Sequence, residues 1–187
     1  RVRNTAVNAI AAMGDRIADR ILVDFDRMPL VVREQMILVL GRLGGGKVTK
    51  TIRECLSAKE RWLRINAVEA CSSLGSPELD AELVNILRNS ETDIWVRATA
   101  VAALGRSKNA QAADIIATQL KHEDARVRAN AIEALSELGW PQLPEACHKL
   151  LHDRNDRVRV NSAIALWKSG HQEVFAELEK MSRDRSR

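Results

Sequence analysis

One short pattern occurs six times along the chain and constrains its fold more than any other feature. Each copy has an apolar residue, an arginine, and then an alanine-rich apolar run that ends near a glycine. The arginines are spaced 30, 31, 33, 31 and 31 residues apart. They are Arg3, Arg33, Arg64, Arg97, Arg128 and Arg159. A self-similar period of this length is typical of a solenoid, in which each unit stacks on its neighbours.

The residues that follow each arginine have the spacing of two helices. Counted from the arginine, positions +3, +4 and +7 are mostly apolar, which is the stripe of an amphipathic helix. Position +11 is glycine in five copies, as expected for the left-handed residue that ends a helix. Apolar residues then recur at +15, +19 and +23, on one face of a second helix. We therefore expect each repeat to contain a helix A, a glycine turn and a helix B.

The fourth copy departs from this pattern. Gly105 lies at position +8, and Lys108 occupies the glycine position +11. We expect a distorted helix A or turn there. The longer spacing before this copy also predicts a longer loop near residues 89–92.

The repeats resemble the short HEAT-like repeats first grouped with the phycobilisome lyase family. The segments 127–135 and 158–166 match best, and an acidic residue, Asp124 or Asp156, precedes each of them. The resemblance covers essentially the whole chain. It implies an all-α fold, a right-handed α-α superhelix (solenoid) of six HEAT-like helical hairpins.

The repeats account for all 187 residues, so we predict a single HEAT-like repeat domain over residues 1–187. The expected repeats are 1–28, 29–59, 60–91, 92–123, 124–154 and 155–187. The chain has no initiator Met and begins inside a helix A, without the polar cap that terminal repeats need. We expect it to be part of a longer protein.

Composition restricts the partners and the cellular location that we expect for the chain. The net charge of +4 is only mildly basic, which gives weak support to nucleic-acid binding. Cys71 and Cys147 occupy core positions, and Cys55 lies on a helix B. An odd number of cysteines without a secretory signal predicts reduced thiols and a cytoplasmic protein. No apolar run reaches the length of a membrane span.

The six repeated arginines form what we call the arginine ladder. An arginine in the first turn of a helix opposes the positive end of the helix dipole, so each needs a compensating partner. We expect a structural ladder, in which each arginine pairs with backbone carbonyls or with a loop carboxylate. The preceding loops offer Glu60, Asp93, Asp124 and Asp156. Arg33 has no such acid nearby and is the expected exception.

Two motifs look chemical but lack the required context. Residues 41–47 match the phosphate-binding string GxxxxGK, but the string falls on the turn between two helices and Val48 follows the lysine. His148 and His152 share a helix face, but no third metal ligand has a convincing spacing. We predict no catalytic residue, no cofactor and no metal site.

Two surface features suggest partner binding. Position +24 near the end of helix B is mostly cationic, and position +21 becomes basic toward the C-terminus. Trp62 and Trp95 each precede a ladder arginine by two residues and could form an interface edge, although they also fit a structural staple at the helix entry. The candidate partner-binding residues are Arg27, Arg88, Lys121, Lys149, His152, Lys180, Trp62 and Trp95.

We therefore predict a non-catalytic protein–protein interaction or scaffold module. It would bind a protein or an acidic peptide on the helix B surface, which the resemblance implies is concave. The basic rows also fit a solvated face whose cations favour the helix C-terminus. Three functions from different classes compete with this prediction. They are a bilin lyase or isomerase subunit, as the family name implies, a nucleic-acid-binding solenoid, and a regulatory domain of a sensor or transporter-associated protein.

Overall fold

A computed structural model of the chain describes residues 15–174 and Glu179. Across these residues the regular structure is helical, without a strand. The chain divides into two compact units, Arg1–Ala103 and Leu104–Arg187, and each is described by itself. The predicted helix A of repeat 1, most of helix B of repeat 6, and the candidates Arg3 and Lys180 lie outside the described residues. The single domain of six repeats stays a prediction.

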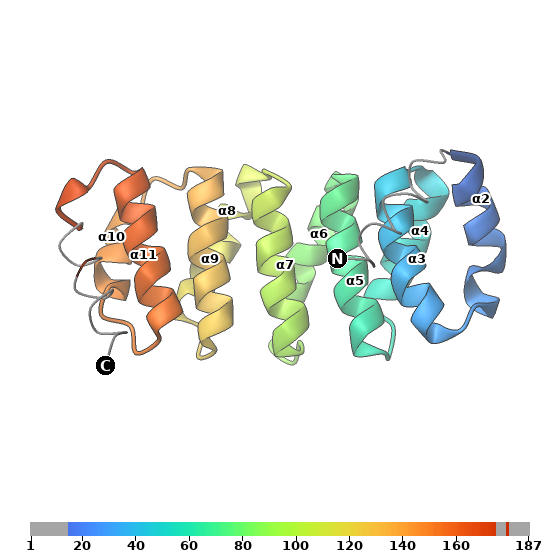
Figure 1. Cartoon of the computed structure of the whole chain (residues 1–187), viewed down its shortest axis with the longest axis horizontal. Helices are drawn as coiled ribbons and strands as arrows, with labels where there is room; N and C mark the ends of the chain where they lie inside the picture. The colour runs from blue at the N-terminus through green and yellow to red at the C-terminus, as the bar shows by residue number, and fades with distance from the viewer. Residues whose placement is uncertain (1–14, 175–178, 180–187) are drawn as a thin grey trace. The chain divides into compact units, whose positions relative to one another are not determined.

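The first unit contains consecutive helical hairpins (Figure 1). Its elements are α2 (Asp15–Asp24), the 3₁₀ helix η1 (Phe25–Arg27), α3 (Leu30–Leu43), α4 (Gly46–Leu56), α5 (Arg61–Leu74), α6 (Pro77–Arg88) and most of α7 (Ile94–Arg106). The helices A, α3 and α5, pack against each other, and α4 covers α5 from the helix B layer.

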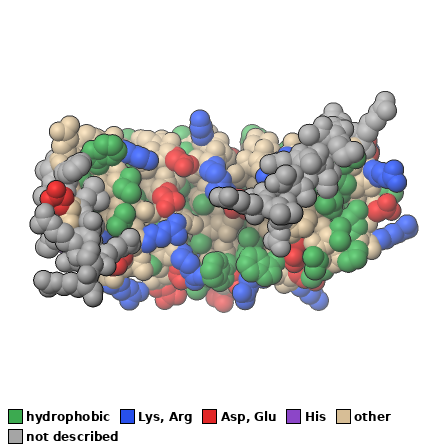
Figure 2. All heavy atoms as spheres, in the orientation of Figure 1, with side chains coloured by type: hydrophobic (Ala, Val, Ile, Leu, Met, Phe, Trp, Pro, Cys, Tyr) green, Lys and Arg blue, Asp and Glu red, His purple; other side chains and the backbone are tan. Residues whose placement is uncertain are grey.

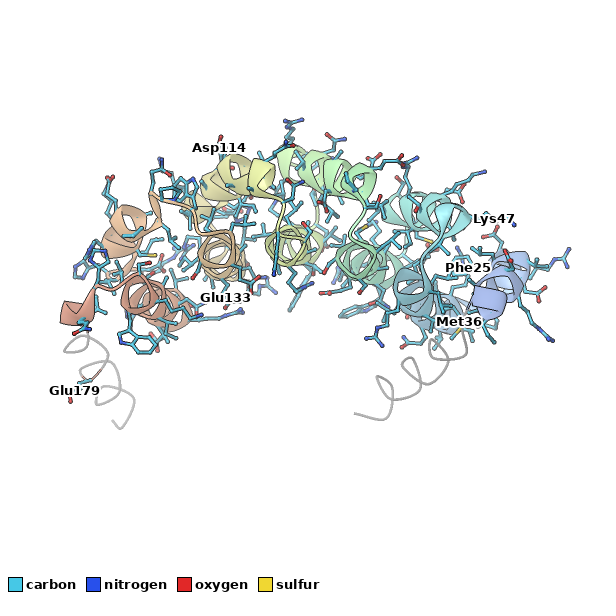
Figure 3. All side chains as sticks on the ribbon, turned by 90° about the horizontal axis from the view of Figure 1, so that it is seen from above. Phe25, Met36, Lys47, Asp114, Glu133 and Glu179 are labelled. Atoms are coloured by element: carbon cyan, nitrogen blue, oxygen red, sulfur yellow. The ribbon has the colours of Figure 1, made fainter. Side chains whose placement is uncertain are left out.

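The second unit repeats this arrangement. Its elements are the end of α7, η2 (Ala110–Ala112), α8 (Ala113–Thr118), η3 (Gln119–Lys121), α9 (Ala125–Leu138), α10 (Leu143–Leu150), α11 (Asp156–Lys168) and η4 (Gln172–Val174). Helices A (α9 and α11) pack together, and α8 and α10 form the helix B layer beside them (Figure 3). The predicted all-α solenoid class is confirmed.

The core is built from the apolar positions that the repeat pattern predicts. Buried residues at positions +4 and +7 of helix A are Ile37, Leu40, Val68, Cys71, Val101, Leu104, Ile132, Leu135, Ala163 and Leu166. Buried residues at positions +15 and +19 of helix B are Val48, Ile52, Leu79, Leu83, Ala112, Ile116, Leu143, Cys147 and Val174. Removing these side chains from water is the main force that holds each hairpin to its neighbours.

The turn between the helices of repeat 4 keeps the positive φ of the other described turns without their glycine. Gly75 and Gly139 end α5 and α9 with φ of 61° and 65°. Lys108, at the same repeat position, has φ of 56°, a left-handed conformation that costs a residue with a Cβ about 1 kcal/mol. α7 itself is continuous, so the expected irregularity lies in the turn and in helix B, which is divided into η2, α8 and η3.

Gly105 has a packing role that its sequence position does not reveal. A Cβ built on it would lie 2.6 Å from the Cβ of Ala134 on α9. Gly41 occupies the same repeat position and meets Ala70 of α5 at the same distance. Glycine at position +8 therefore allows neighbouring helices A to approach closely within each unit.

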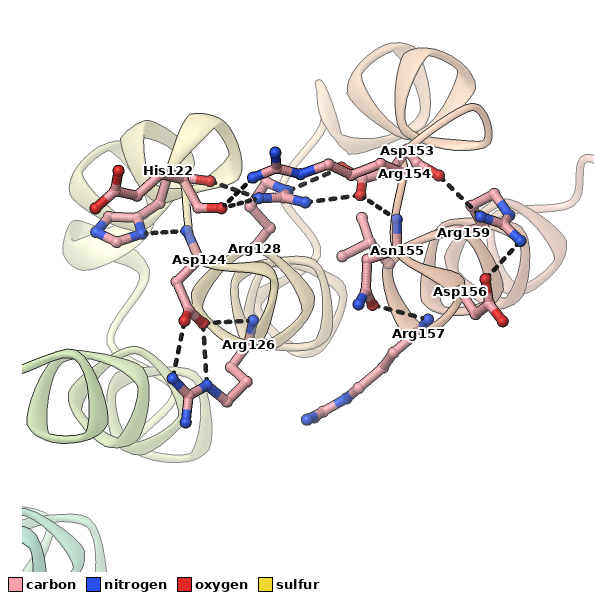
Figure 4. Close-up of polar contacts among 12 residues, drawn as sticks. His122, Asp124, Arg126, Arg128, Asp153, Arg154, Asn155, Asp156, Arg157 and Arg159 are labelled. Carbon is pink, nitrogen blue, oxygen red and sulfur yellow. Dashed lines mark hydrogen bonds and ion pairs between the residues drawn. The ribbon is translucent and has the colours of Figure 1, made fainter.

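The ladder arginines reach back to the end of the preceding helix B. Arg64 Nη1 donates to the carbonyl oxygen of Ala58 at 2.8 Å. Arg128 Nη1 donates to the carbonyl oxygens of His122 and Glu123 at 2.8 and 2.7 Å (Figure 4). These carbonyls lie within two residues of the end of helix B, near the negative end of its dipole, and this offsets the unfavourable position of the arginine in its own helix.

Arg97 and Arg159 make the same kind of contact. Arg97 donates to the carbonyl oxygens of Leu87, at 2.8 Å, and Asn89, across the longer loop. Arg159 Nη1 donates to the carbonyl oxygen of Asp153 at 3.0 Å. The ladder therefore fixes helix A to the helix B before it.

Arg33 has different surroundings. Its guanidinium carbon lies 5.3 Å from the centre of the Phe25 ring, a cation–π distance. Its Nε is buried and has no hydrogen-bond partner among the described residues. The loop before Arg33 offers Pro29 where repeats 3, 4 and 5 have an acid.

The loop acids mostly bond to groups other than their own ladder arginine. Asp93 accepts a hydrogen bond from the N–H of Trp95 at 2.9 Å and pairs with Arg61 at 3.2 Å. Asp124 accepts from the N–H and the guanidinium of Arg126, and these hydrogen bonds lower the pKa of Asp124 to about 2. These aspartates therefore cap the start of helix A.

Two ladder arginines do pair with carboxylates (Figure 4). Arg159 Nη2 lies 2.6 Å from Asp156 Oδ1 at the surface. Arg128 Nε and Nη2 donate to the two oxygens of Asp153 at 2.8 and 2.7 Å, and their side chains are 7% and 9% exposed. Burial alone would raise the pKa of Asp153, but hydrogen bonds from Arg128 and from the N–H of Asn155 outweigh it and lower that pKa.

Candidate functional site

A groove of about 530 Å³ lies on the helix B surface of the second unit. α8 and η3 form one wall, and α10 with the turn before it forms the other. The lining residues are Asp114, Ala117, Thr118, Leu120, Lys121, Trp140, Gln142, Glu145, Ala146, Lys149 and Leu150. Figure 3 shows the labelled Asp114 on the outer side of the helix B layer, facing away from the helices A. The labelled Glu133 lies on the helix A layer.

Helical spacing explains why these residues face one groove. On α8 and η3 they lie at 114, 117, 118 and 121, and on α10 and the residue before it at 142, 145, 146 and 149. Both sets follow the i, i+3, i+4, i+7 pattern of a single helix face. The repeat therefore places two matching faces side by side.

The floor of the groove is apolar. Ala117, Leu120, Ala146 and Leu150 contribute aliphatic surface, and the half-buried indole of Trp140 closes one side. An apolar floor that stays open to solvent is typical of a surface that binds a partner.

The rim of the groove carries two cations and two anions. Lys121 and Asp114 are exposed and form no ion pair with another described residue. Lys149 pairs with Glu145 on the same helix at 3.0 Å, but both side chains are more than three quarters exposed. Such a pair contributes little and can exchange for a partner's charge.

The remaining basic candidates on helix B lie outside this groove. Arg27 and Arg88 are exposed in the first unit, and His152 is exposed one turn beyond Lys149 in the second. Position +24 is interrupted by Ser57 in repeat 2. Of the predicted basic residues, only Lys121 and Lys149 are brought together by the described structure in a common depression.

Trp62 and Trp95 lie at the starts of α5 and α7, in the first unit. Their side chains are 59% and 47% exposed. Figure 2 shows hydrophobic side chains along the lower edge of the molecule, near the N-terminal ends of these two helices. The ion pair between Arg61 and Asp93 links the same two helix starts. The interface role of this edge stays a prediction.

Sequence reasoning missed Trp140, Asp114 and Glu145 as members of the site. The repeat pattern places Trp140 in a turn and gives no sign that it lines a groove. Asp114 and Glu145 share repeat position +17, so comparing that position with the basic positions +21 and +24 would have revealed an anion on the same wall as each lysine.

Other chemistry-bearing groups do not gather into a site. Burial raises the pKa of the free thiol of Cys55 to about 11, and the pKa values of Cys71 and Cys147 to about 12. The rings of His148 and His171 meet edge to face at 5.4 Å. Over residues 15–174, no group of three potential His, Cys, Asp or Glu ligands could hold a metal ion.

None of the described helices is long and apolar enough to cross a membrane. α5, for example, has 14 residues and carries arginines and a glutamate among its apolar positions.

Comparison with known proteins agrees with the fold. The crystal structure of YibA from Escherichia coli, a structural genomics target, has a TM-score of 0.70 and 18% sequence identity. The match covers 93% of this chain and 67% of YibA. At this identity the likeness concerns the fold alone. None of the curated proteins matches the sequence.

The family of the chain follows from a second comparison. A family model described as HEAT repeats matches residues 20–93 and 80–151. These segments include four of the six ladder arginines, three of the glycine turns and both walls of the groove. Because the matched segments cover well over half of the chain, the protein belongs to the HEAT-repeat family.

Proposed function

We propose that this protein is a non-catalytic binding module that holds a segment of a partner protein in the groove between α8 and α10. The observation that carries the proposal is the open apolar floor with charged residues at its rim. HEAT repeats typically mediate protein interactions, and the family is generally non-enzymatic. Cytoplasmic location belongs to the same proposal and is supported by three free, buried cysteines.

The charges of the rim favour a protein over a nucleic acid. A groove that follows a phosphate backbone presents cations, which release counterions from the nucleic acid on binding. Here Asp114 and Glu145 lie in the same groove as Lys121 and Lys149. Each acid would repel a phosphate, whereas a protein segment can offer both signs of charge.

A partner captured from lysate provides the material for the test. Its affinity is measured by calorimetry for the wild type, for Lys121→Glu/Lys149→Glu, and for the control Lys50→Glu/Lys59→Glu. The control changes the net charge equally, and Lys50 pairs with Glu54 as Lys149 pairs with Glu145. Exposed charges contribute roughly 0.2–1 kcal/mol each, and reversal adds repulsion, so the groove variant should bind about tenfold or more weakly.

The control variant should bind within about twofold of the wild type, since roughly 0.4 kcal/mol corresponds to that ratio. Equal affinity of all three proteins for the captured partner would show that the partner does not bind in the groove. Circular dichroism on each variant separates loss of binding from loss of fold.

A further inference from the structure

We infer that the occupant of the groove is an amphipathic helix that carries one basic and one acidic residue two turns apart, rather than a uniformly acidic peptide. This inference rests on the proposed function and specifies the chemistry of the partner. It follows from the distribution of charge along one wall of the groove, the aliphatic side chains between the walls, and the length of that wall.

Charge is divided between the two ends of one wall of the groove. Asp114 lies in the first turn of α8, and Glu145 lies near the start of α10. Lys121 lies in η3, at the opposite end of the α8 wall, whereas Lys149 lies one turn from Glu145 on α10 and pairs with it at 3.0 Å. Because α8 and α10 are helices B of consecutive repeats, they run in the same direction. The α8 and η3 wall is therefore acidic at one end and basic at the other, while the acid and the base of the α10 wall lie next to each other.

The floor favours a helix over an extended peptide. An extended segment lying between the walls would place many of its N–H and C=O groups against Ala117, Leu120, Ala146 and Leu150, which offer side chains without hydrogen-bonding atoms. The uncharged polar side chains of the lining, Thr118 and Gln142, are too few to pair with all of these backbone groups. Unpaired polar groups on an apolar surface are costly. A helix satisfies its own backbone and presents only side chains, and ridges of a third helix fit the depression between two neighbouring helices.

The length of the groove sets the spacing of the partner's charges. Asp114 and Lys121 are seven residues apart, which at a rise of about 1.5 Å per residue is about 10 Å. The same distance spans seven residues of a guest helix, with apolar residues at the third and fourth positions between its charges. Either direction of the guest satisfies this pattern, so the inference concerns charge type and spacing.

Three synthetic 18-residue peptides test this inference. They share one apolar stripe and differ only at two positions seven residues apart: Lys with Glu, Glu with Glu, or Lys with Lys. Both positions are more than one turn from either end, where the helix dipole has little influence. A hydrocarbon staple on the outer face equalises helicity, and fluorescence anisotropy with the whole protein gives the dissociation constants at physiological salt.

The Lys/Glu peptide should bind about tenfold more tightly than either of the remaining two, because only it finds attraction at both ends. Asp114→Asn/Glu145→Gln should abolish the discrimination against the Glu/Glu peptide, and Lys121→Gln/Lys149→Gln should abolish it against the Lys/Lys peptide. These neutral variants leave the apolar floor intact.

Several results would overturn the inference. Equally tight binding of the Glu/Glu and Lys/Glu peptides would favour a uniformly acidic partner instead. Discrimination that survives both pairs of neutral substitutions would place its origin elsewhere. Failure of all three peptides to bind would exclude a simple mixed-charge helix, whereas the proposed function is judged separately on the captured partner and the lysine reversals.

Discussion

Replacing Arg128 with alanine should destabilise the second unit far more than the same change at Arg159. Arg128 makes two hydrogen bonds to Asp153 and two to backbone carbonyls, and its side chain is 7% exposed. Alanine would leave Asp153, which is 9% exposed, as an uncompensated carboxylate. Removing one member of a buried ion pair costs about 3–5 kcal/mol.

Arg159 provides the matched comparison because it occupies the same position in the next repeat. Its side chain is 30% exposed, and its partner Asp156 is 58% exposed, so water can replace the lost contact. An ion pair of that exposure contributes about 1 kcal/mol or less. The two substitutions remove the same side chain, so their difference measures the greater enclosure of Arg128 together with its two additional hydrogen bonds.

Urea titration followed by circular dichroism measures both effects. With a slope of about 2 kcal/mol per molar urea, Arg128→Ala should lower the midpoint by about 1.5–2.5 M and Arg159→Ala by about 0.5 M or less. Arg128→Met/Asp153→Leu should recover much of the loss, because it removes the orphaned charge. Equal shifts for the two arginines, or no recovery in the double variant, would refute the reasoning.

Three further predictions follow from the structure. Asp124 has its pKa lowered to about 2, so its contribution to the free energy of unfolding is complete above the ordinary value of 3.8 and is lost as pH falls toward 2. The difference in unfolding free energy between wild type and Asp124→Asn should therefore shrink over that range, and a constant difference would contradict the prediction. Lys108→Gly should raise the free energy of unfolding by about 0.5–1 kcal/mol, measured by urea titration, because glycine adopts the left-handed turn without strain, and a loss of stability would count against that explanation. The buried thiols of Cys55, Cys71 and Cys147, with pKa values of about 11 to 12, should react with a thiol reagent at pH 8 only after urea is added, and prompt labelling of the folded protein would disagree.

The sequence was sufficient for the repeat and its core. The spacing of apolar residues such as Ile37, Leu40 and Ile52 predicts which side chains are buried, because one face of each helix must leave water. The glycines at position +11 likewise predict the positive φ of the turn after helix A. Lys108 shows the limit of that argument, since tertiary packing holds a left-handed turn without glycine.

The groove was harder to predict because it depends on the distance between two helices and on what fills it. Lys121 and Lys149 could be identified as exposed cations from their repeat positions. Trp140 and Asp114 enter the same site only because the turn before α10 and the broken helix B of repeat 4 face one another. The row of cations in the sequence does not distinguish Lys121 and Lys149 from Arg27 and Arg88, which belong to the first unit.

The fluorescence of Trp140 tests the proposed binding site most directly. In Trp62→Phe/Trp95→Phe/Trp167→Phe the only remaining indole lines the groove, and in Trp140→Phe/Trp167→Phe the remaining two lie on the edge formed by α5 and α7. On titration with the captured partner, the account predicts a saturable blue shift and protection from acrylamide for Trp140, with unchanged emission from Trp62 and Trp95. Saturable binding with the reverse pattern, a change at Trp62 and Trp95 and none at Trp140, would contradict it.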